Sequence, residues 1–338
     1  MERSIGDLDV LLERAGIPGI SVAVVNSGCV ELRHAGVNHA ATRAAVNHET
    51  VFDAASLSKP VFAYAVLQLI DAGYLKFETR LSDWVSEYVN DDPRSKSVTV
   101  SQALCHATGL PNWRSDEFPL RTHFMPGERF SYSGEGYTWL QRAVERITNE
   151  PLEALMNRLV FEPLGMTQSS YVWRPSFEAN HAAPHDSAQN AGLKRRPQEA
   201  MAAFSLHTTA GDFARFLQAV LAGEHLQPKT AALWLVPHVS VQRPGIVALG
   251  KEDVDIATKI SWGLGWGLEP TRGTFFQWGD SDQGRHKTFA IGSVTEQKGM
   301  VILTNGSRGM AIVPRLVEDI LPGEPPCFDW LGYGRLPQ

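Results

Sequence analysis

Residues 54–70 read Ala54-Ala55-Ser56-Leu57-Ser58-Lys59-Pro60-Val61-Phe62-Ala63-Tyr64-Ala65-Val66-Leu67-Gln68-Leu69-Ile70. Apolar side chains recur here at helical spacing, and Gly73 supplies a stop signal, so the stretch predicts a helix that begins at or just after Ser56. Ser56 and Lys59 are three residues apart and therefore project from the same face of that helix. The lysine amine is expected to lie within hydrogen-bond reach of the serine hydroxyl.

A serine beside a neutral lysine forms a nucleophile with its own base. The positive end of the helix dipole and partial burial both favour the neutral amine, which is the form that accepts a proton. No other serine of the chain has a lysine three residues later. A Ser-x-x-Lys pattern also arises by chance in chains of this length, so the hypothesis depends on what the rest of the sequence places beside it.

Composition describes an ordinary globular protein. The chain has 338 residues, 43% of them hydrophobic and 20% charged, with a net charge of -6. This size suits one large or two interlocked domains, and the charge pattern lacks a basic stripe for nucleic acid.

Cys29, Cys105 and Cys327 show neither metal-ligand spacing nor a disulfide framework, so free thiols are expected. The first nine residues lack a basic segment followed by an apolar run, and no stretch is long enough for a membrane span, so a cytoplasmic protein without membrane contact is expected.

Strand patterns occur at both ends of the chain. Residues 20–25 and 29–33 form a predicted hairpin, after a short helix around residues 8–12. Further strands are predicted at 264–268, 274–278, 287–291 and 300–304, followed by a helix at 310–320. Residues 71–239 show mostly helical patterns.

The expected fold is therefore α+β. Residues 1–70 and 240–338 would form an antiparallel sheet flanked by helices, and residues 71–239 an inserted, mostly helical domain. The active site would lie at the interface between the two.

Two further segments offer chemistry. Tyr132, in Phe130-Ser131-Tyr132-Ser133-Gly134, can relay protons if it lies beside Lys59. The cation or shared hydrogen bonds would then lower its pKa and let it act as general base or as acid to the leaving group. The strand Phe275-Phe276-Gln277-Trp278-Gly279-Asp280 can offer a backbone N–H to an oxyanion, with Gly279 allowing a substrate to approach closely. The alternatives are a core tyrosine in a turn and an ordinary aromatic strand.

Taken in this order, the three segments resemble the serine β-lactamase and penicillin-binding-protein superfamily, specifically the class C-like branch with family VIII carboxylesterases, D-aminopeptidases and related acyltransferases. The resemblance implies that Ser56 is the acylated nucleophile, Lys59 its base and Tyr132 the proton relay. It also implies an oxyanion hole made by the backbone N–H groups of Ser56 and Asp280, and no cofactor or metal. Supporting runs are Pro18-Gly19-Ile20-Ser21-Val22-Ala23-Val24-Val25, Leu104-Cys105-His106-Ala107-Thr108-Gly109-Leu110-Pro111 and Phe161-Glu162-Pro163-Leu164-Gly165-Met166.

Two positions depart from the family pattern. Gly134 replaces the asparagine of Tyr-x-Asn, an amide that usually touches the lysine and the substrate's acyl amide. Gln277 stands where lysine or histidine usually begins the third motif, and a neutral amide holds a carboxylate less well than a cation does. An alternative register, with Trp278 as the first residue of the motif, places Asp280 where glycine belongs.

These departures favour a small-molecule ester as substrate. A D-amino-acid peptidase or amidase, a β-lactamase and an acyltransferase of the same superfamily remain alternatives. A non-catalytic binding or scaffold protein is an alternative of a different class.

Histidines have minor roles in this interpretation. His181 and His185 are four residues apart beside Asp186, but the segment reads as a loop, so a metal site is not expected. His106 and His286 are expected to be structural. No Gly-x-Ser-x-Gly elbow occurs, which disfavours an α/β-hydrolase triad.

Overall fold

The computed structural model describes residues 7–250, 258–281 and 284–334. Residues 1–6, which carry most of the segment examined for a secretion signal, lie outside the described residues. The dominant element is a nine-stranded sheet in the order β3-β2-β1-β11-β10-β9-β8-β7-β6, in which every pairing is antiparallel. The strands are β1 (Gly19–Asn26), β2 (Cys29–His39), β3 (Ala44–Ala45), β6 (Val239–Ser240), β7 (Ser261–Trp262), β8 (Gly267–Glu269), β9 (Thr274–Asp280), β10 (Lys287–Ser293) and β11 (Lys298–Thr304).

Both chain ends contribute to this sheet, as predicted. β1 pairs with β11, and Ile20 lies opposite Thr304. The hairpin from β1 to β2 turns through Ser27 and Gly28, both of which have positive φ angles. Two such residues are typical of the tight turn whose twist matches that of the flanking strands. The predicted α+β fold is confirmed.

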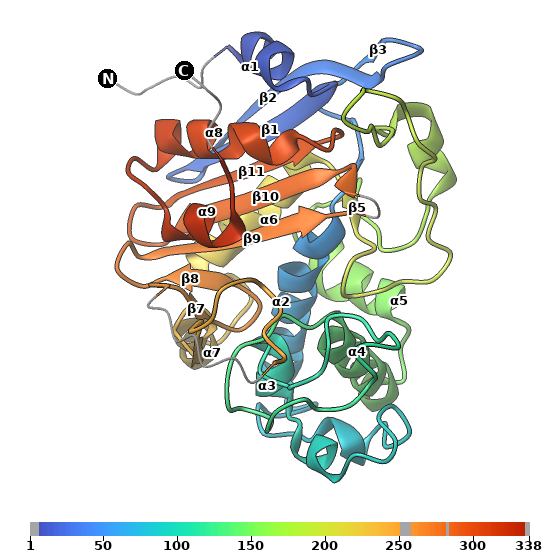
Figure 1. Cartoon of the computed structure of the whole chain (residues 1–338), viewed down its shortest axis with the longest axis vertical. Helices are drawn as coiled ribbons and strands as arrows, with labels where there is room; N and C mark the ends of the chain where they lie inside the picture. The colour runs from blue at the N-terminus through green and yellow to red at the C-terminus, as the bar shows by residue number, and fades with distance from the viewer. Residues whose placement is uncertain (1–6, 251–257, 282–283, 335–338) are drawn as a thin grey trace.

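Alternate residues of β1 pack on opposite faces of the sheet, because side chains alternate along a strand. Ile20 and Val22 join one apolar cluster with helices α1 (Leu8–Ala15), α8 (Val313–Ile320) and α9 (Pro326–Leu331). Ala23 and Val25 join the other cluster with α6 (Ala210–Ala222) and α2 (Ser58–Asp71). Figure 1 shows α8 and α9 in front of the sheet and α6 behind it.

The helical part of the molecule lies beyond one edge of the sheet, in the lower half of Figure 1. It contains α3 (Val100–Leu104), α4 (Gly134–Thr148) and α5 (Leu152–Met156), while α7 (Pro228–Trp234) lies beside β7 and β8. The division into domains at residues 71 and 239 stays a prediction. Helix α6 does not follow this division, because it comes from the middle segment and yet packs on β11 and β1 of the sheet. Among the described residues, no helix is both long and apolar enough to cross a membrane.

Two local predictions need correction. A single strand at 264–268 is wrong: the chain turns between β7 and β8 through Gly265, at φ 101°, where a Cβ would lie 2.5 Å from the Cβ of Ala63. The helix expected to begin at residue 310 begins at Val313 after a 3-10 turn, and α9 was not predicted because it is only six residues long.

Candidate active site

Ser56 lies in a tight turn at the start of α2. A 3-10 turn, Ala55–Leu57, leads directly into the helix, which places Ser56 just before its first turn as predicted. Ala55 has φ 48°, a left-handed conformation that is costly for a residue with a side chain. The Oδ1 atom of Asp53 accepts the N–H of Ala55 at 2.9 Å and so stabilises the turn that presents Ser56.

Lys59 is buried and directed at Ser56. Its Nζ lies 3.0 Å from Ser56 Oγ and 2.6 Å from the carbonyl oxygen of Ala203. Both partners are neutral, and burial lowers the pKa of Lys59 to about 7. At neutral pH a large fraction of this amine is therefore unprotonated and able to accept a proton.

Tyr132 completes the group. The Nζ of Lys59 lies 4.8 Å from the centre of the Tyr132 ring. Burial raises the pKa of Tyr132, and hydrogen bonds with Ser56 and Gln277 only partly offset that effect. The expectation that the Lys59 cation or shared hydrogen bonds lower the pKa of Tyr132 is wrong in its net direction. The two hydrogen bonds do lower this pKa, but the loss of water disfavours the phenolate more, so the phenol keeps its proton at neutral pH.

The Tyr132 ring is held between two other rings. His106 stacks on it, with the two ring centres 4.1 Å apart. The centre of the Trp278 ring lies 5.1 Å from the centre of the Tyr132 ring. The Nδ1 atom of His106 accepts the N–H of Ser133 at 3.0 Å. Burial lowers the pKa of His106, so the ring is neutral and supports the tyrosine loop.

The end of β9 forms an edge beside the nucleophile turn. Pairing with β8 reaches only Phe276, whereas pairing with β10 continues to Asp280. Among the described residues, 277–280 therefore pair with a strand only on the β10 side, and β9 contacts the turn that contains Ser56. The carboxylate of Asp280 pairs with Lys287 at 2.5 Å.

Gly279 has a packing role at this edge. A Cβ at this position would lie 2.2 Å from Thr288 Oγ1 and 2.5 Å from the carbonyl oxygen of Ala54. The absent side chain thus allows the strand to approach the nucleophile turn, whereas the sequence suggested that it makes room for a substrate.

Gln277 points inward, toward Tyr132. Its Nε2 donates to the Tyr132 hydroxyl at 3.0 Å and to the carbonyl oxygens of Trp278 and Ser56 at 3.0 and 3.4 Å. The side chain is fully buried, and its Oε1 has no hydrogen-bond partner among the described residues. These contacts fit the register that begins the third motif at Gln277.

Gly134 faces an aromatic ring. A Cβ at Gly134 would lie 2.5 to 2.9 Å from three carbon atoms of the Trp113 indole. The indole therefore fills the space that a side chain at position 134 would need, and the two cannot coexist without rearrangement.

Several residues of the site were not identified from the sequence. Asp53, close before Ser56, could have been noticed as a charged residue in an apolar run. The others come from distant segments and carry no local signal. They are Trp113, Ala203, Arg195, which pairs with Asp53, and Phe204, whose ring meets that of Trp113.

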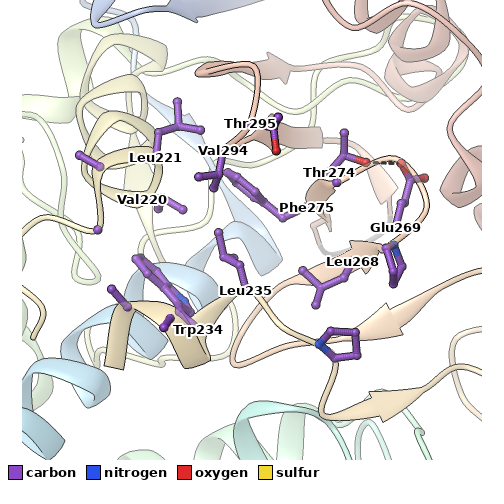
Figure 2. Close-up of a pocket in the computed structure, with 17 residues that line it drawn as sticks. Val220, Leu221, Trp234, Leu235, Leu268, Glu269, Thr274, Phe275, Val294 and Thr295 are labelled. Carbon is purple, nitrogen blue, oxygen red and sulfur yellow. Dashed lines mark hydrogen bonds between the residues drawn. The ribbon is translucent and has the colours of Figure 1, made fainter. Parts of the chain in front are cut away.

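The cavity shown in Figure 2 is separate from this site. It measures about 510 Å³ and is lined mainly by apolar residues of α6, α7, β8 and the start of β9. Phe275 lines it, at the opposite end of β9 from residues 277–280, and Ser56, Lys59 and Tyr132 do not. The cavity is therefore distinct from the cluster of Ser56, Lys59 and Tyr132.

The two histidines of the pair, His181 and His185, lie in different surroundings. His185 Nε2 accepts the N–H of Ala40 at 3.0 Å, while the His181 ring packs against Trp173. In the described ranges, no three His, Cys, Asp or Glu residues are grouped as metal ligands. The three cysteines are free thiols, as expected.

Comparison with known proteins agrees with this geometry. The Beta-lactamase family matches residues 7–320. "Penicillin-binding protein 4" of Amycolatopsis lactamdurans is 26% identical, over 93% of this chain and 87% of its own, and "Lovastatin esterase" of Penicillium rubens is 27% identical, over 62% and 68%. The octameric penicillin-binding protein homologue from Pyrococcus abyssi has the same fold, with a TM-score of 0.74 at 19% identity, over 97% of this chain and 77% of its own. The chain therefore belongs to the Beta-lactamase family and is a serine hydrolase.

Proposed function

We propose that the protein is an esterase that cleaves small carboxylic esters through an acyl-enzyme at Ser56. Trp113 carries this proposal, because its indole fills the space beside Gly134 where an amide side chain would otherwise meet an amide substrate. Gln277 supports it, since its amide is occupied by Tyr132 and carries no charge to hold a substrate carboxylate.

The reaction follows from the positions of the three side chains. Ser56 Oγ attacks the ester carbonyl carbon as neutral Lys59 takes the hydroxyl proton across 3.0 Å. The carbonyl oxygen becomes an oxyanion that the backbone N–H groups of Ser56 and Asp280 stabilise. The carbon–oxygen bond to the alcohol then breaks, and the departing oxygen receives a proton from Tyr132, which regains one from Lys59. Water attacks the acyl-enzyme in the same way and releases the acid.

A direct experiment is hydrolysis of p-nitrophenyl acetate and butyrate by wild type and Ser56→Ala. Turnover by wild type and its loss in the variant are the expected results. If wild type leaves both esters intact, or if Ser56→Ala is as fast, the proposal fails.

The main alternative is a peptidase, amidase or β-lactamase, which the similarity to a penicillin-binding protein over most of the chain favours. Intact-mass measurement after treatment with penicillin or nitrocefin separates the two functions. Covalent modification of Ser56 with faster turnover of these compounds than of esters would favour the alternative.

A further inference from the structure

Trp113 is a partly exposed aromatic residue next to the loop that carries Tyr132. Its ring lies against Gly134, two residues after Tyr132. On its other side it meets Phe204, with ring centres 5.5 Å apart in an edge-to-face arrangement. Phe204 directly follows Ala203, whose carbonyl oxygen binds Lys59. The two rings therefore flank the groups that hold the nucleophile and its base.

The backbone on both sides of Trp113 is tied to the first turn of α4. Asn112 Oδ1 accepts the N–H of Gly134 at 3.0 Å, and the Asn112 carbonyl oxygen accepts the N–H of Glu135 at 3.0 Å. On the other side, Arg114 pairs with the buried carboxylate of Glu135 at 2.7 Å. Trp113 is nevertheless 43% exposed. A large aromatic side chain that is exposed but held in place offers binding area at little cost in conformational entropy.

We propose that Trp113, supported by Phe204, forms an aromatic wall that recognises a flat apolar group of the ester, in either its acyl or its alcohol half. This inference rests on the proposed esterase function. An indole offers no charge and a broad apolar face, so a planar ring in the substrate gains both burial and ring–ring contact there. A ring–ring contact of this kind corresponds to about a tenfold preference.

The test compares three esters: ethyl acetate, ethyl phenylacetate and benzyl acetate. In Trp113→Ala, the kcat/KM of an aromatic ester relative to that of ethyl acetate should fall about tenfold from its wild-type ratio. Trp113→Phe keeps a flat ring and should stay within about threefold of wild type. A decrease for ethyl phenylacetate assigns the wall to the acyl half, and a decrease for benzyl acetate assigns it to the alcohol half.

Trp84 provides a matched control, because it is 42% exposed and follows the 3-10 turn Leu81–Asp83 in the helical part. Trp84→Ala should leave all three ratios unchanged. Should Trp113→Ala unfold, Trp113→Leu carries the same test with an apolar side chain that is not flat.

Two outcomes overturn the proposal in different ways. Equal ratios in wild type and Trp113→Ala reject the aromatic wall while leaving the esterase function intact. Failure of wild type to cleave any of the three esters rejects the esterase function and the wall with it.

Discussion

Arg195 holds the carboxylate of Asp53 beneath the nucleophile turn, with Nη2 3.0 Å from Oδ1 and 2.9 Å from Oδ2. The same Oδ1 accepts the N–H of Ala55, and Arg195 also donates to the carbonyl oxygen of Phe204 at 2.8 Å. Burial raises the pKa of Asp53, but Arg195 and other nearby groups outweigh burial, so the carboxyl stays ionised. The Arg195–Asp53 ion pair thus links the turn at Ser56 to the segment of Ala203 and Phe204. The carbonyl oxygen of Ala203 is the one that accepts a hydrogen bond from Lys59.

Replacement of Arg195 by leucine should destabilise the fold and slow catalysis. Asp53 is almost fully buried, and a buried charge that loses its partner costs about 3 kcal/mol. Urea unfolding should show this loss, and kcat should fall because the turn at Ala55 loses its support. Arg196→Leu is the control, since its pair with Glu178 is about half exposed on both sides. Equal effects of the two variants would contradict the role of Arg195.

The pKa of Lys59 predicts how ester hydrolysis depends on pH. Because only the neutral amine accepts the Ser56 proton, kcat/KM should rise with pH below about 7 and level off above it. The measurement is a pH–rate profile with an ester that does not ionise. Lys59→Arg should be inactive at every pH, since a guanidinium stays charged. A profile that is flat from acid to neutral pH would refute the role of Lys59 as base.

The same pKa shift predicts a stability effect in Lys59→Met. The folded-state pKa of about 7 lies below the ordinary lysine pKa of 10.5, so the fold disfavours the charged amine. Burial of Lys59 therefore lowers the free energy of unfolding by its full amount below pH 7. This penalty diminishes by about 1.4 kcal/mol per pH unit as the pH rises toward 10.5. Lys59→Met should therefore resist urea better than wild type at pH 6, and the difference should shrink by pH 9. A difference that grows with pH would have the wrong sign.

Gln277 should act on catalysis through Tyr132. Gln277→Leu removes the donor 3.0 Å from the Tyr132 hydroxyl and should lower kcat about tenfold with little change in KM. Tyr132→Phe should lower kcat by about a hundredfold or more. Because the two side chains share one hydrogen bond, Gln277→Leu should add almost nothing in the Tyr132→Phe background. Additive losses in the double variant would show that Gln277 acts independently.

Gly134 and Trp113 should be strongly coupled. Gly134→Asn places a side chain where the Trp113 indole lies and should destabilise the fold by about 1–3 kcal/mol. Adding Trp113→Ala removes the obstacle and should restore most of that stability. Thermal unfolding of the two single variants and the double variant measures the coupling, and simple additivity would argue against the shared space.

Prediction from sequence succeeded where the interactions are local. Ser56 and Lys59 meet because a helix places residues three apart on one face, and the hairpin at Ser27 and Gly28 follows from turn chemistry. The assignment of Gln277 to the third motif stays a prediction, and the direction of its side chain was not predictable from the sequence. Whether this amide faces a substrate or Tyr132 depends on how β9 packs against the tyrosine loop.

The sequence by itself determined that Ser56 and Lys59 lie side by side, that the two chain ends pair in one sheet, and the family, since each depends on short patterns and their order. Only the tertiary structure decided that Tyr132 keeps its proton, because burial depends on every segment around it. The tertiary structure also brought Arg195 to Asp53 and Trp113 to Gly134. No spacing along the chain encodes these contacts, which arise from packing between segments that are distant in sequence.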